Sequence, residues 1–416
     1  MDANTPQVDP LDARWEEFYK DLHRHPELGF QEHRTAGLVA EQLTALGAEV
    51  TTGVATTGVL GVLRNGRGPT ALVRADMDAL PVTEETGLDY ASSATGTDAE
   101  GRTVGVSHAC GHDLHTTALL AAAERLSRTR ETWSGTLVLV HQPAEELGAG
   151  AQALVDDGLY DRVPVPDVVL GQHVAPLPAG TIAAHPGAAY AGSDSLRVVL
   201  HGRGAHGSMP QNSVDPVVMA AETVMRLQAI VAREVAPTDV VVLTVGSLRA
   251  GEAANVIPGS AELLLNIRTY DAAVREHVLG AVDRVVRGVS ATAGAPREPE
   301  ISNIERFPVV VNDADALDRT LDAFRGWLGP AHVFDPGAGA GSEDVGILAT
   351  AAGAPLSYWL LGGADPTLFT TGRLDDPALR TVPSNHSPRY APVLEPTLAL
   401  GAHALTLAVR TWLRAA

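Results

Sequence analysis

The sequence is poor in cysteine and lysine, and it has no long apolar run. Cys110 is the only cysteine among 416 residues, so no disulfide can form within the chain. The sequence has no stretch of about 18 apolar residues, which a membrane-spanning helix needs, and its acidic first residues lack the apolar region of a secretory signal. We therefore expect a cytoplasmic protein that does not enter a membrane.

Positive charge is scarce as well, and Lys20 is the only lysine. The 30 Lys and Arg residues are outnumbered by 50 Asp and Glu residues, which gives a formal net charge of -20. Nucleic acids and anionic membranes bind basic surfaces, so neither is expected as a partner. A content of 45% hydrophobic and 19% charged residues is typical of a globular protein, and the length suggests two domains.

Short apolar runs alternate with helical patterns in the first part of the chain. We expect strands over residues 59–63, 71–75, 136–141 and 168–172. We expect helices over residues 11–25, 34–46, 114–127 and 149–157. This alternation is typical of parallel β-α units and predicts a three-layer α/β/α domain.

A different pattern begins near residue 188. We expect strands over 195–201, 240–245 and 261–268, and helices over 216–233 and 272–289. This β-α-β-β-α-β order predicts a ferredoxin-like α+β domain. The first pattern resumes after residue 306 and ends in a helix over 396–413. The chain thus reads as one α/β domain, 1–187 with 306–416, interrupted by an inserted domain, 188–305.

Polar residues follow the expected strands of the α/β domain and also precede one of its helices. They are Asp76 and Asp78 after 71–75, Glu145 and Glu146 after 136–141, His173 after 168–172, and Cys110 and His112 before the helix at 114. Ligands bind at the carboxyl ends of strands in open α/β sheets. The clusters therefore predict a binding site at this edge of the sheet.

Sulfur, nitrogen and oxygen donors are mixed in this set. Cys110, His112, Glu146 and His173, joined by the late His386, suit zinc or a neighbouring first-row metal better than magnesium or calcium. A Cys-x-His pair by itself is a weak signal, and a buried cysteine beside an ordinary surface histidine is the alternative for Cys110 and His112.

The adjacent acids Glu145 and Glu146 suggest hydrolytic chemistry. As a surface pair they would be unremarkable, but Pro143 ends the apolar strand and places them on its exit loop. One carboxylate can then bind metal while the other faces a water whose pKa the metal lowers towards about 7.

The other histidines divide into two groups. His108, His115 and His141 lie near the clusters, and we expect them to hydrogen-bond to ligands rather than to bind metal. We expect the rest to be surface or structural residues: His23, His25, His33, His185, His201, His277, His332 and His403.

Several motifs together resemble one known family. They include DLHRHPELGFQEHRTA, RADMDALPVTEETGLDY, HACGHDLHTTALLAAA, GTLVLVHQPAEE, GRGAHGSMPQNSVDP and NHSPRYAP. The chain resembles the aminoacylase branch of the two-domain dinuclear zinc metallopeptidase and amidohydrolase family, which includes carboxypeptidase G, hippurate hydrolases and plant hydrolases of indoleacetyl-amino-acid conjugates. Bacterial N-acyl-amino-acid aminoacylases are the most similar. The match extends from about residue 14 to 413.

The resemblance implies a zinc-exopeptidase-like catalytic domain with an inserted lid and dimerisation domain. It implies metal-dependent hydrolysis of the amide bond of small N-acyl amino acids by a homodimer. It also implies two divalent metal ions, zinc first and manganese or cobalt as alternatives, with ligands Cys110, His112, Glu146, His173 and His386. Where relatives carry His-x-Asp, this chain has Asp76-Met77-Asp78, and Cys110 replaces part of the missing coordination.

The resemblance also implies roles for residues that do not bind metal. Glu145 is the general base and later the acid, and Asp78 orients a ligand. His206 helps to stabilise the oxyanion, and in many relatives this histidine comes from the partner subunit. Asn255 and Arg268 hold the carboxylate of the substrate, and the guanidinium can pair with it bidentately.

Other functions remain open at this point. A metallo-exopeptidase acting on dipeptides and an N-carbamoyl-amino-acid hydrolase would use the same centre. A metal-stabilised binding protein without turnover has no need of Glu145 or His206. A cysteine hydrolase built on Cys110 leaves Glu146, His173 and His386 without a role.

Overall fold

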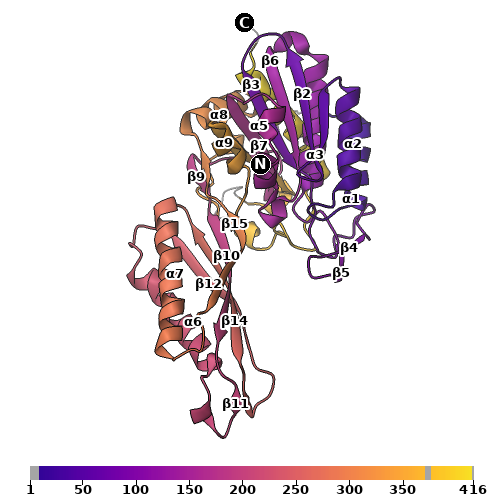
Figure 1. The fold of residues 1–416 in the computed structure, drawn as a ribbon. Helices are drawn as coiled ribbons and strands as arrows, with labels where there is room; N and C mark the ends of the chain where they lie inside the picture. Colours follow the sequence, from indigo (N-terminus) through magenta and orange to yellow (C-terminus); the bar gives the residue numbers. More distant parts are fainter. Residues whose placement is uncertain (1–8, 371–375, 415–416) are drawn as a thin grey trace. The chain divides into compact units, whose positions relative to one another are not determined.

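The computed structural model describes residues 9–370 and 376–414 (Figure 1). Its contacts divide the chain into two compact units. The first comprises the described residues of 1–189 and 344–416 together with Val311–Gly337, and the second comprises Tyr190–Val310 and Ala338–Glu343. The expected division at residues 188 and 305 stays a prediction about folding units. Within the described ranges, no helix has both the length and the apolar character needed to span a bilayer.

The first unit is built on a mixed 8-stranded sheet. In sheet order its strands are β1 (Glu49–Val54), β2 (Gly58–Asn65), β6 (Gly135–Gln142), β3 (Thr70–Asp76), β7 (Val168–Pro178), β18 (Leu356–Ala364), β8 (Ile182–Ala183) and β17 (Val333–Phe334). The four central strands β6, β3, β7 and β18 run parallel to one another. Between β1 and β2, and between β2 and β6, the pairing is antiparallel.

The expectation of purely parallel β-α units is therefore wrong at this edge of the sheet. β1 was not expected from the sequence, because its exposed and half-buried residues give no apolar run. Only residues 55–57 separate it from β2. So short a connection can join antiparallel strands but not parallel ones, which need a long crossover.

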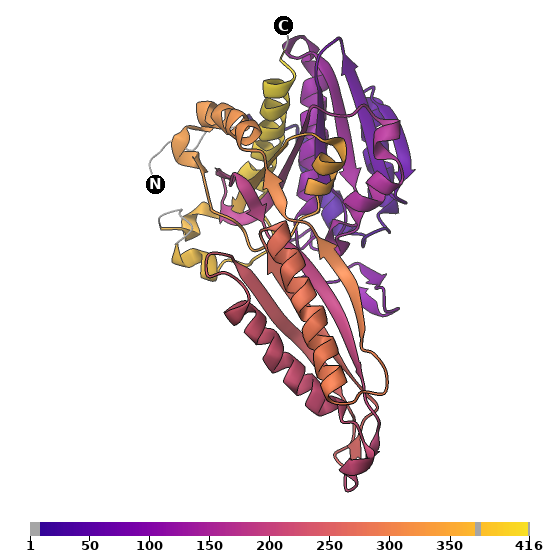
Figure 2. The same cartoon turned by 60° about the vertical axis from the view of Figure 1, so that its left-hand side comes forward.

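Helices cover both faces of this sheet (Figures 1 and 2). One face packs against α1 (Ala13–Arg24), α2 (His33–Ala45), α3 (His112–Arg128), α8 (Ala314–Leu328) and α10 (Leu394–Trp412). The other face packs against α4 (Gly150–Asp156) and α9 (Gly346–Ala352). Helix α3 is buried along most of its length between the sheet, α1, α2 and α10. The predicted three-layer α/β/α architecture is confirmed.

The second unit has the predicted β-α-β-β-α-β order. Its elements are β10 (Gly192–His201), α6 (Pro216–Arg233), β12 (Val241–Ala250), β14 (Ser260–Thr269), α7 (Ala272–Thr292) and β15 (Glu300–Phe307). The four strands form an antiparallel sheet in the order β12-β14-β10-β15. Helices α6 and α7 lie side by side and share an apolar core with the sheet (Figure 2). This is the ferredoxin-like arrangement that the sequence predicted.

A short segment from later in the chain also belongs to the second unit. Arg268 donates from Nη1 to the carbonyl oxygen of Ala340 at 2.6 Å, and Tyr270 donates from its hydroxyl to that of Gly339 at 3.0 Å. The backbone N–H of Ala191 also donates to Gly339, at 3.2 Å. These bonds attach residues 338–343 to the ends of β10 and β14, a contact that no local sequence pattern could reveal.

Candidate metal centre

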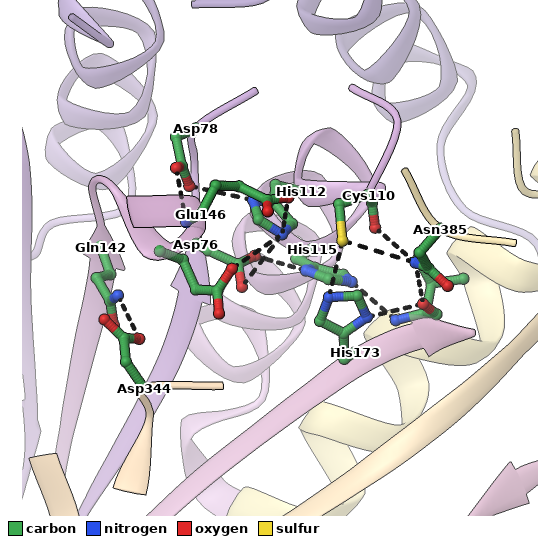
Figure 3. A network of polar contacts seen from close by, with 12 residues as sticks. Asp76, Asp78, Cys110, His112, His115, Gln142, Glu146, His173, Asp344 and Asn385 are labelled. Atoms are coloured by element: carbon green, nitrogen blue, oxygen red, sulfur yellow. Dashed lines mark hydrogen bonds and ion pairs between the residues drawn. The ribbon is translucent and has the colours of Figure 1, made fainter. Parts of the chain in front are cut away.

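The expected metal ligands converge at one edge of the first unit's sheet. Figure 3 shows four of them, Cys110, His112, Glu146 and His173. Cys110 and His112 lie at the start of α3, and Glu146 lies in a 3-10 helix, Glu145–Leu147, that follows β6. His386 comes from a loop before α10 and donates its backbone N–H to the carbonyl oxygen of Ala109 at 2.8 Å. These segments meet because β3, β6 and β7 are parallel neighbours whose carboxyl ends share this edge.

His173 differs from the expectation in one respect. It does not follow a strand that ends at residue 172, because β7 continues to Pro178. His173 pairs with Leu360 of β18 inside the sheet. The apolar run did not predict the end of this strand. His173 and Pro176 interrupt the run, but the backbone pairing with β18 continues past them.

The donor atoms at the site form several overlapping groups, and two of them share Glu146. Another joins His112 and His173 with Asp76 and His115. Cys110, Glu146 and His386 offer donor atoms that lie within 4.8 Å of one another, and so do His112, Glu145 and Glu146. The sulfur of Cys110 lies 3.4 Å from Nε2 of His173. Nε2 of His386 lies 3.3 Å from Oε2 of Glu146. All five expected ligands are thus brought together in a pattern that suits two neighbouring ions.

Hydrogen bonds leave the donor atoms free to face a cation. His112 donates from Nδ1 to Asp78 at 3.2 Å, and His173 donates from Nδ1 to the carbonyl oxygen of Val174 at 2.7 Å. Nε2 of His112 and Oε1 of Glu146 are buried and have no hydrogen-bond partner in the described part of the chain. Unpartnered buried polar atoms are costly, so these residues fit a bound metal ion.

The electrostatics of the site also fit a cation. Burial raises the pKa of Glu146 to about 8, and burial, with Glu146 and Glu145 nearby, raises the pKa of the Cys110 thiol well above its ordinary value. Burial lowers the pKa of His112, but Asp76, Asp78 and Glu146 outweigh it and raise this pKa to about 10. The raised pKa values show that negative charge is crowded at this site. Divalent metal ions would compensate for that charge.

Asp78 contacts two of the expected ligands at once. Its Oδ1 accepts the Nδ1–H of His112 at 3.2 Å, and its Oδ2 accepts the backbone N–H of Glu146 at 3.0 Å. The residue is buried. This geometry is that of a residue that orients ligands from behind.

A buried network behind the site was not predicted. Arg74 pairs from Nη1 with Asp76 at 2.6 Å and from Nη2 with Asp344 at 3.0 Å. Gln142 donates to Asp344 at 2.8 Å, as Figure 3 shows. Asp76 also contacts Nδ1 of His115 at 2.5 Å. The sequence contains one signal of this network, an arginine inside the apolar run of β3. A buried guanidinium needs carboxylate partners, so the arginine indicates that acidic side chains lie nearby.

The three histidines near the site do not behave as expected. His115 uses both ring nitrogens, because its Nε2 accepts the backbone N–H of Val174 at 2.8 Å while Nδ1 faces Asp76. It therefore holds β7 rather than a metal ligand. His108 and His141 are buried without a hydrogen-bond partner among the residues described, so the expectation that they bond to ligands is wrong. Burial lowers the pKa of His141 to about 3.

The remaining candidate residues belong to the second unit, where His206 and Asn255 lie close together and Arg268 lies apart from them. His206 pairs with Val256 in a two-stranded sheet, and Asn255 accepts the backbone N–H of Gly207 at 2.7 Å. Arg268 lies towards the other end of β14, eight residues beyond Ser260, or about 26 Å along an extended strand. Within one chain, Asn255 and Arg268 therefore cannot contact the same small carboxylate.

Comparison with known proteins agrees with this geometry. Residues 72–373 match the model of peptidase family M20/M25/M40. A hippurate hydrolase of Campylobacter jejuni is 37% identical over 75% of this chain and 79% of its own. An N-acyl-L-amino acid amidohydrolase of Geobacillus stearothermophilus is 38% identical over 67% of this chain and 73% of its own.

A solved structure extends the similarity to the whole fold. The YXEP protein of Bacillus subtilis, described as a dinuclear metal-binding peptidase of the same family, has a TM-score of 0.75 and 27% identity, and the match covers 96% of this chain and 98% of that one. The resemblance drawn from the motifs is confirmed. The chain belongs to peptidase family M20/M25/M40, and it is a metal-dependent hydrolase of amide bonds.

Proposed function

We propose that this enzyme cleaves the amide bond of N-acyl amino acids, with Glu145 as the general base. Two divalent ions, zinc in the first place, would be held by five ligands: Cys110, His112, Glu146, His173 and His386. The observation that carries the proposal is the pair of donor groups sharing Glu146, with Glu145 in one of them. The relatives named for hippurate and for N-acyl-L-amino acids support this class of substrate.

The residues around the ions have separate functions in the proposed hydrolysis, namely proton transfer and the positioning of ligands. When bound, the ions lower the pKa of water and polarise the scissile carbonyl. Glu145, whose Oε2 lies 3.9 Å from Nε2 of His112, takes the proton of the attacking water and passes it to the leaving amine. Asp78 keeps His112 and the backbone of Glu146 in place during both steps.

His206, Asn255 and Arg268 complete the proposed site through a homodimer. In this proposal His206 stabilises the developing oxyanion, and Asn255 and Arg268 bind the free carboxylate of the substrate. Arg268 lies near one end of β14, and Asn255 lies beyond the other end. This separation supports a contribution from a second copy of the chain.

The exposed surface of the second unit supports the same dimer. β12 is an edge strand, and its Val242 and Leu248 are 47% and 45% exposed. On α6, Val218 and Met225 are 62% and 73% exposed. An unpaired strand edge beside apolar side chains is a surface that a second chain can cover.

The proposal is tested by hydrolysis of a panel of amides with metal-reconstituted enzyme. The panel varies the acyl chain and the amino acid, and it includes dipeptides and N-carbamoyl amino acids as separate arms. We expect the highest kcat/KM on N-acyl amino acids and full loss of activity with a chelator. A preference for dipeptides would indicate an exopeptidase, and a preference for carbamoyl compounds would indicate a carbamoylase. Activity that survives chelation would point to a cysteine hydrolase.

We also propose that the enzyme acts in the cytoplasm. Its single cysteine stands among the candidate ligands, 3.4 Å from His173, and only the reduced thiolate binds metal. A reducing compartment preserves that state.

A further inference from the structure

The loop that carries Glu145 and Glu146 contains a residue with a strained backbone conformation. We call residues 143–147 the acidic loop. Ala144 has φ 49°, in the left-handed region that non-glycine residues seldom adopt. Such a conformation persists only where its surroundings hold it, and it occurs often at functional sites.

A buried carboxylate holds the backbone at this residue. Oε1 of Glu32 accepts the N–H of Ala144 at 2.8 Å, and Oε2 of Glu32 accepts the hydroxyl of Thr57 at 2.5 Å. The carbonyl oxygen of Ala144 in turn accepts the N–H of Gly150 at 3.1 Å. The residue is therefore bound on both sides, and one of the two partners lies 112 residues away in the sequence.

The packing around the acidic loop leaves it little freedom. A Cβ atom at Gly29 would lie 3.2 Å from the Cβ of Ala144, and one at Gly150 would lie 1.7 Å from the carbonyl oxygen of Pro143. Two carboxylates thus hold the backbone on either side of Glu145, Glu32 at Ala144 and Asp78 at Glu146.

The side chain of Glu32 does not stabilise the helix that it precedes. It stands at the N-cap of α2, but its side chain makes no capping hydrogen bond. Glu27 does that work instead, accepting the backbone N–H groups of Arg34 at 2.9 Å and Thr35 at 2.8 Å. Glu32 is fully buried, and burial, with Asp78 nearby, raises its pKa to about 7. Burying a carboxyl group costs free energy unless hydrogen bonds compensate for it, and Glu32 receives them from Ala144 and Thr57.

We propose that Glu32 is a positioning residue that holds Ala144 in its left-handed conformation and thereby directs Glu145 and Glu146 into the metal centre. This inference rests on the proposed roles of those two glutamates. It adds a side chain from the loop before α2 to the machinery of the site, although that side chain touches neither metal nor substrate.

The test compares two substitutions near the start of α2. Glu32→Ala removes the bond to Ala144, whereas Glu27→Ala removes the helix cap and leaves the acidic loop untouched. Zinc affinity is measured by competition with a chelating dye, and kcat and KM are measured on the best substrate of the panel. We expect Glu32→Ala to weaken zinc binding and to lower kcat, each by about 10–100-fold, as for other residues that orient ligands. We expect Glu27→Ala to lower only the melting temperature.

Three further variants sharpen the test, and the first two keep the result interpretable if Glu32→Ala does not fold. Glu32→Gln retains an oxygen that can accept the N–H of Ala144, so zinc affinity should stay within about threefold of the wild type. Thr57→Val removes the hydroxyl that orients Glu32, so zinc affinity should fall in the same direction as in Glu32→Ala. Ala144→Gly, combined with Glu32→Ala, should recover part of the zinc affinity, because glycine adopts the left-handed conformation without strain.

Two outcomes would overturn the inference. One is an unchanged zinc affinity in Glu32→Ala and Thr57→Val, and the other is a loss in Glu27→Ala as large as in Glu32→Ala. An inactive wild type that binds zinc normally would instead refute the proposed function, while the zinc affinities of the variants would still decide the role of Glu32.

Discussion

Hydrogen bonds on the far side of each ring decide which histidine nitrogens face the candidate metal centre. His112 and His173 both donate from Nδ1, one to Asp78 and the other to the backbone of Val174. Their Nε2 atoms are left to point towards Glu146 and Cys110. His115 has the opposite fate, because Asp76 and the backbone occupy both of its nitrogens. The hydrogen-bond partners thus leave Nε2 of His112 and of His173 available to a metal ion, whereas neither ring nitrogen of His115 is available.

The role of Glu145 is tested by Glu145→Gln. Glutamine keeps the size of the side chain but cannot accept a proton, so kcat should fall by about 10²–10⁴-fold while both ions remain bound. The exposed Glu49→Gln, which lies on β1, provides the control for a change of one charge. Metal content and kcat are measured on the same preparations. Near-normal turnover in Glu145→Gln would show that another group accepts the proton.

Elements far apart in the sequence are joined by buried ion pairs. His23 of α1 contacts Asp113 of α3 through Nδ1 at 2.6 Å and Glu84 through Nε2 at 3.1 Å. Tyr19 and Tyr90 pack against the ring. Burial lowers the pKa of His23, but the two carboxylates outweigh it and raise this pKa from 6.5 to about 10. The first helix is thereby tied to the helix that presents His112.

This ion pair predicts a dependence of stability on pH. Because the pKa of His23 is raised on folding, its contribution is complete below pH 6.5 and is lost as the pH rises towards about 10. His23→Gln leaves two buried carboxylates without a charged partner and should cost about 3–5 kcal/mol at pH 6. Melting temperatures of both proteins, measured from pH 6 to 10, should therefore converge at high pH. A difference that stays constant over this range would contradict the ion pair.

Some elements could be predicted from the sequence and others could not, for physical reasons. Strands β3 and β6 are continuous apolar runs followed by acids, so both the strands and the site at their ends were visible. β1 is half exposed and was missed, and β7 was cut short at the polar His173. Residue types sufficed to choose the candidate ligands. The bond from Glu32 to Ala144 and the bonds from Arg74 to Gln142 and Asp344 join residues more than 60 positions apart, which no local pattern encodes.

At the scale of the whole molecule, the positions of the candidate residues motivate the proposed homodimer. His206 and Asn255 lie beyond one end of β14 and Arg268 lies near the other, so a single second unit cannot direct all three at one substrate. The candidate metal ligands, by contrast, all belong to the first unit. The proposed roles of all three residues would therefore need a second copy of the second unit.

Mixing two inactive variants tests this arrangement. His206→Ala and Arg268→Ala should each lower kcat/KM strongly when alone. In a mixed dimer, one of the two sites receives an intact His206 and an intact Arg268, so random exchange should restore about a quarter of wild-type activity. Activity is measured before and after the two variants are mixed and allowed to exchange. No gain on mixing, in a sample shown to contain mixed dimers, would place all catalytic residues of a site in one chain.

The central claim is that five side chains of the first unit hold two metal ions. Anomalous diffraction at the zinc edge, from crystals grown with zinc, tests it most directly. We expect two peaks, with the sulfur of Cys110 about 2.3 Å from one ion and the histidine Nε2 atoms about 2.0–2.1 Å from their ions. Peaks outside this set of ligands, or a single ion that leaves Cys110, His173 or His386 uncoordinated, would contradict it.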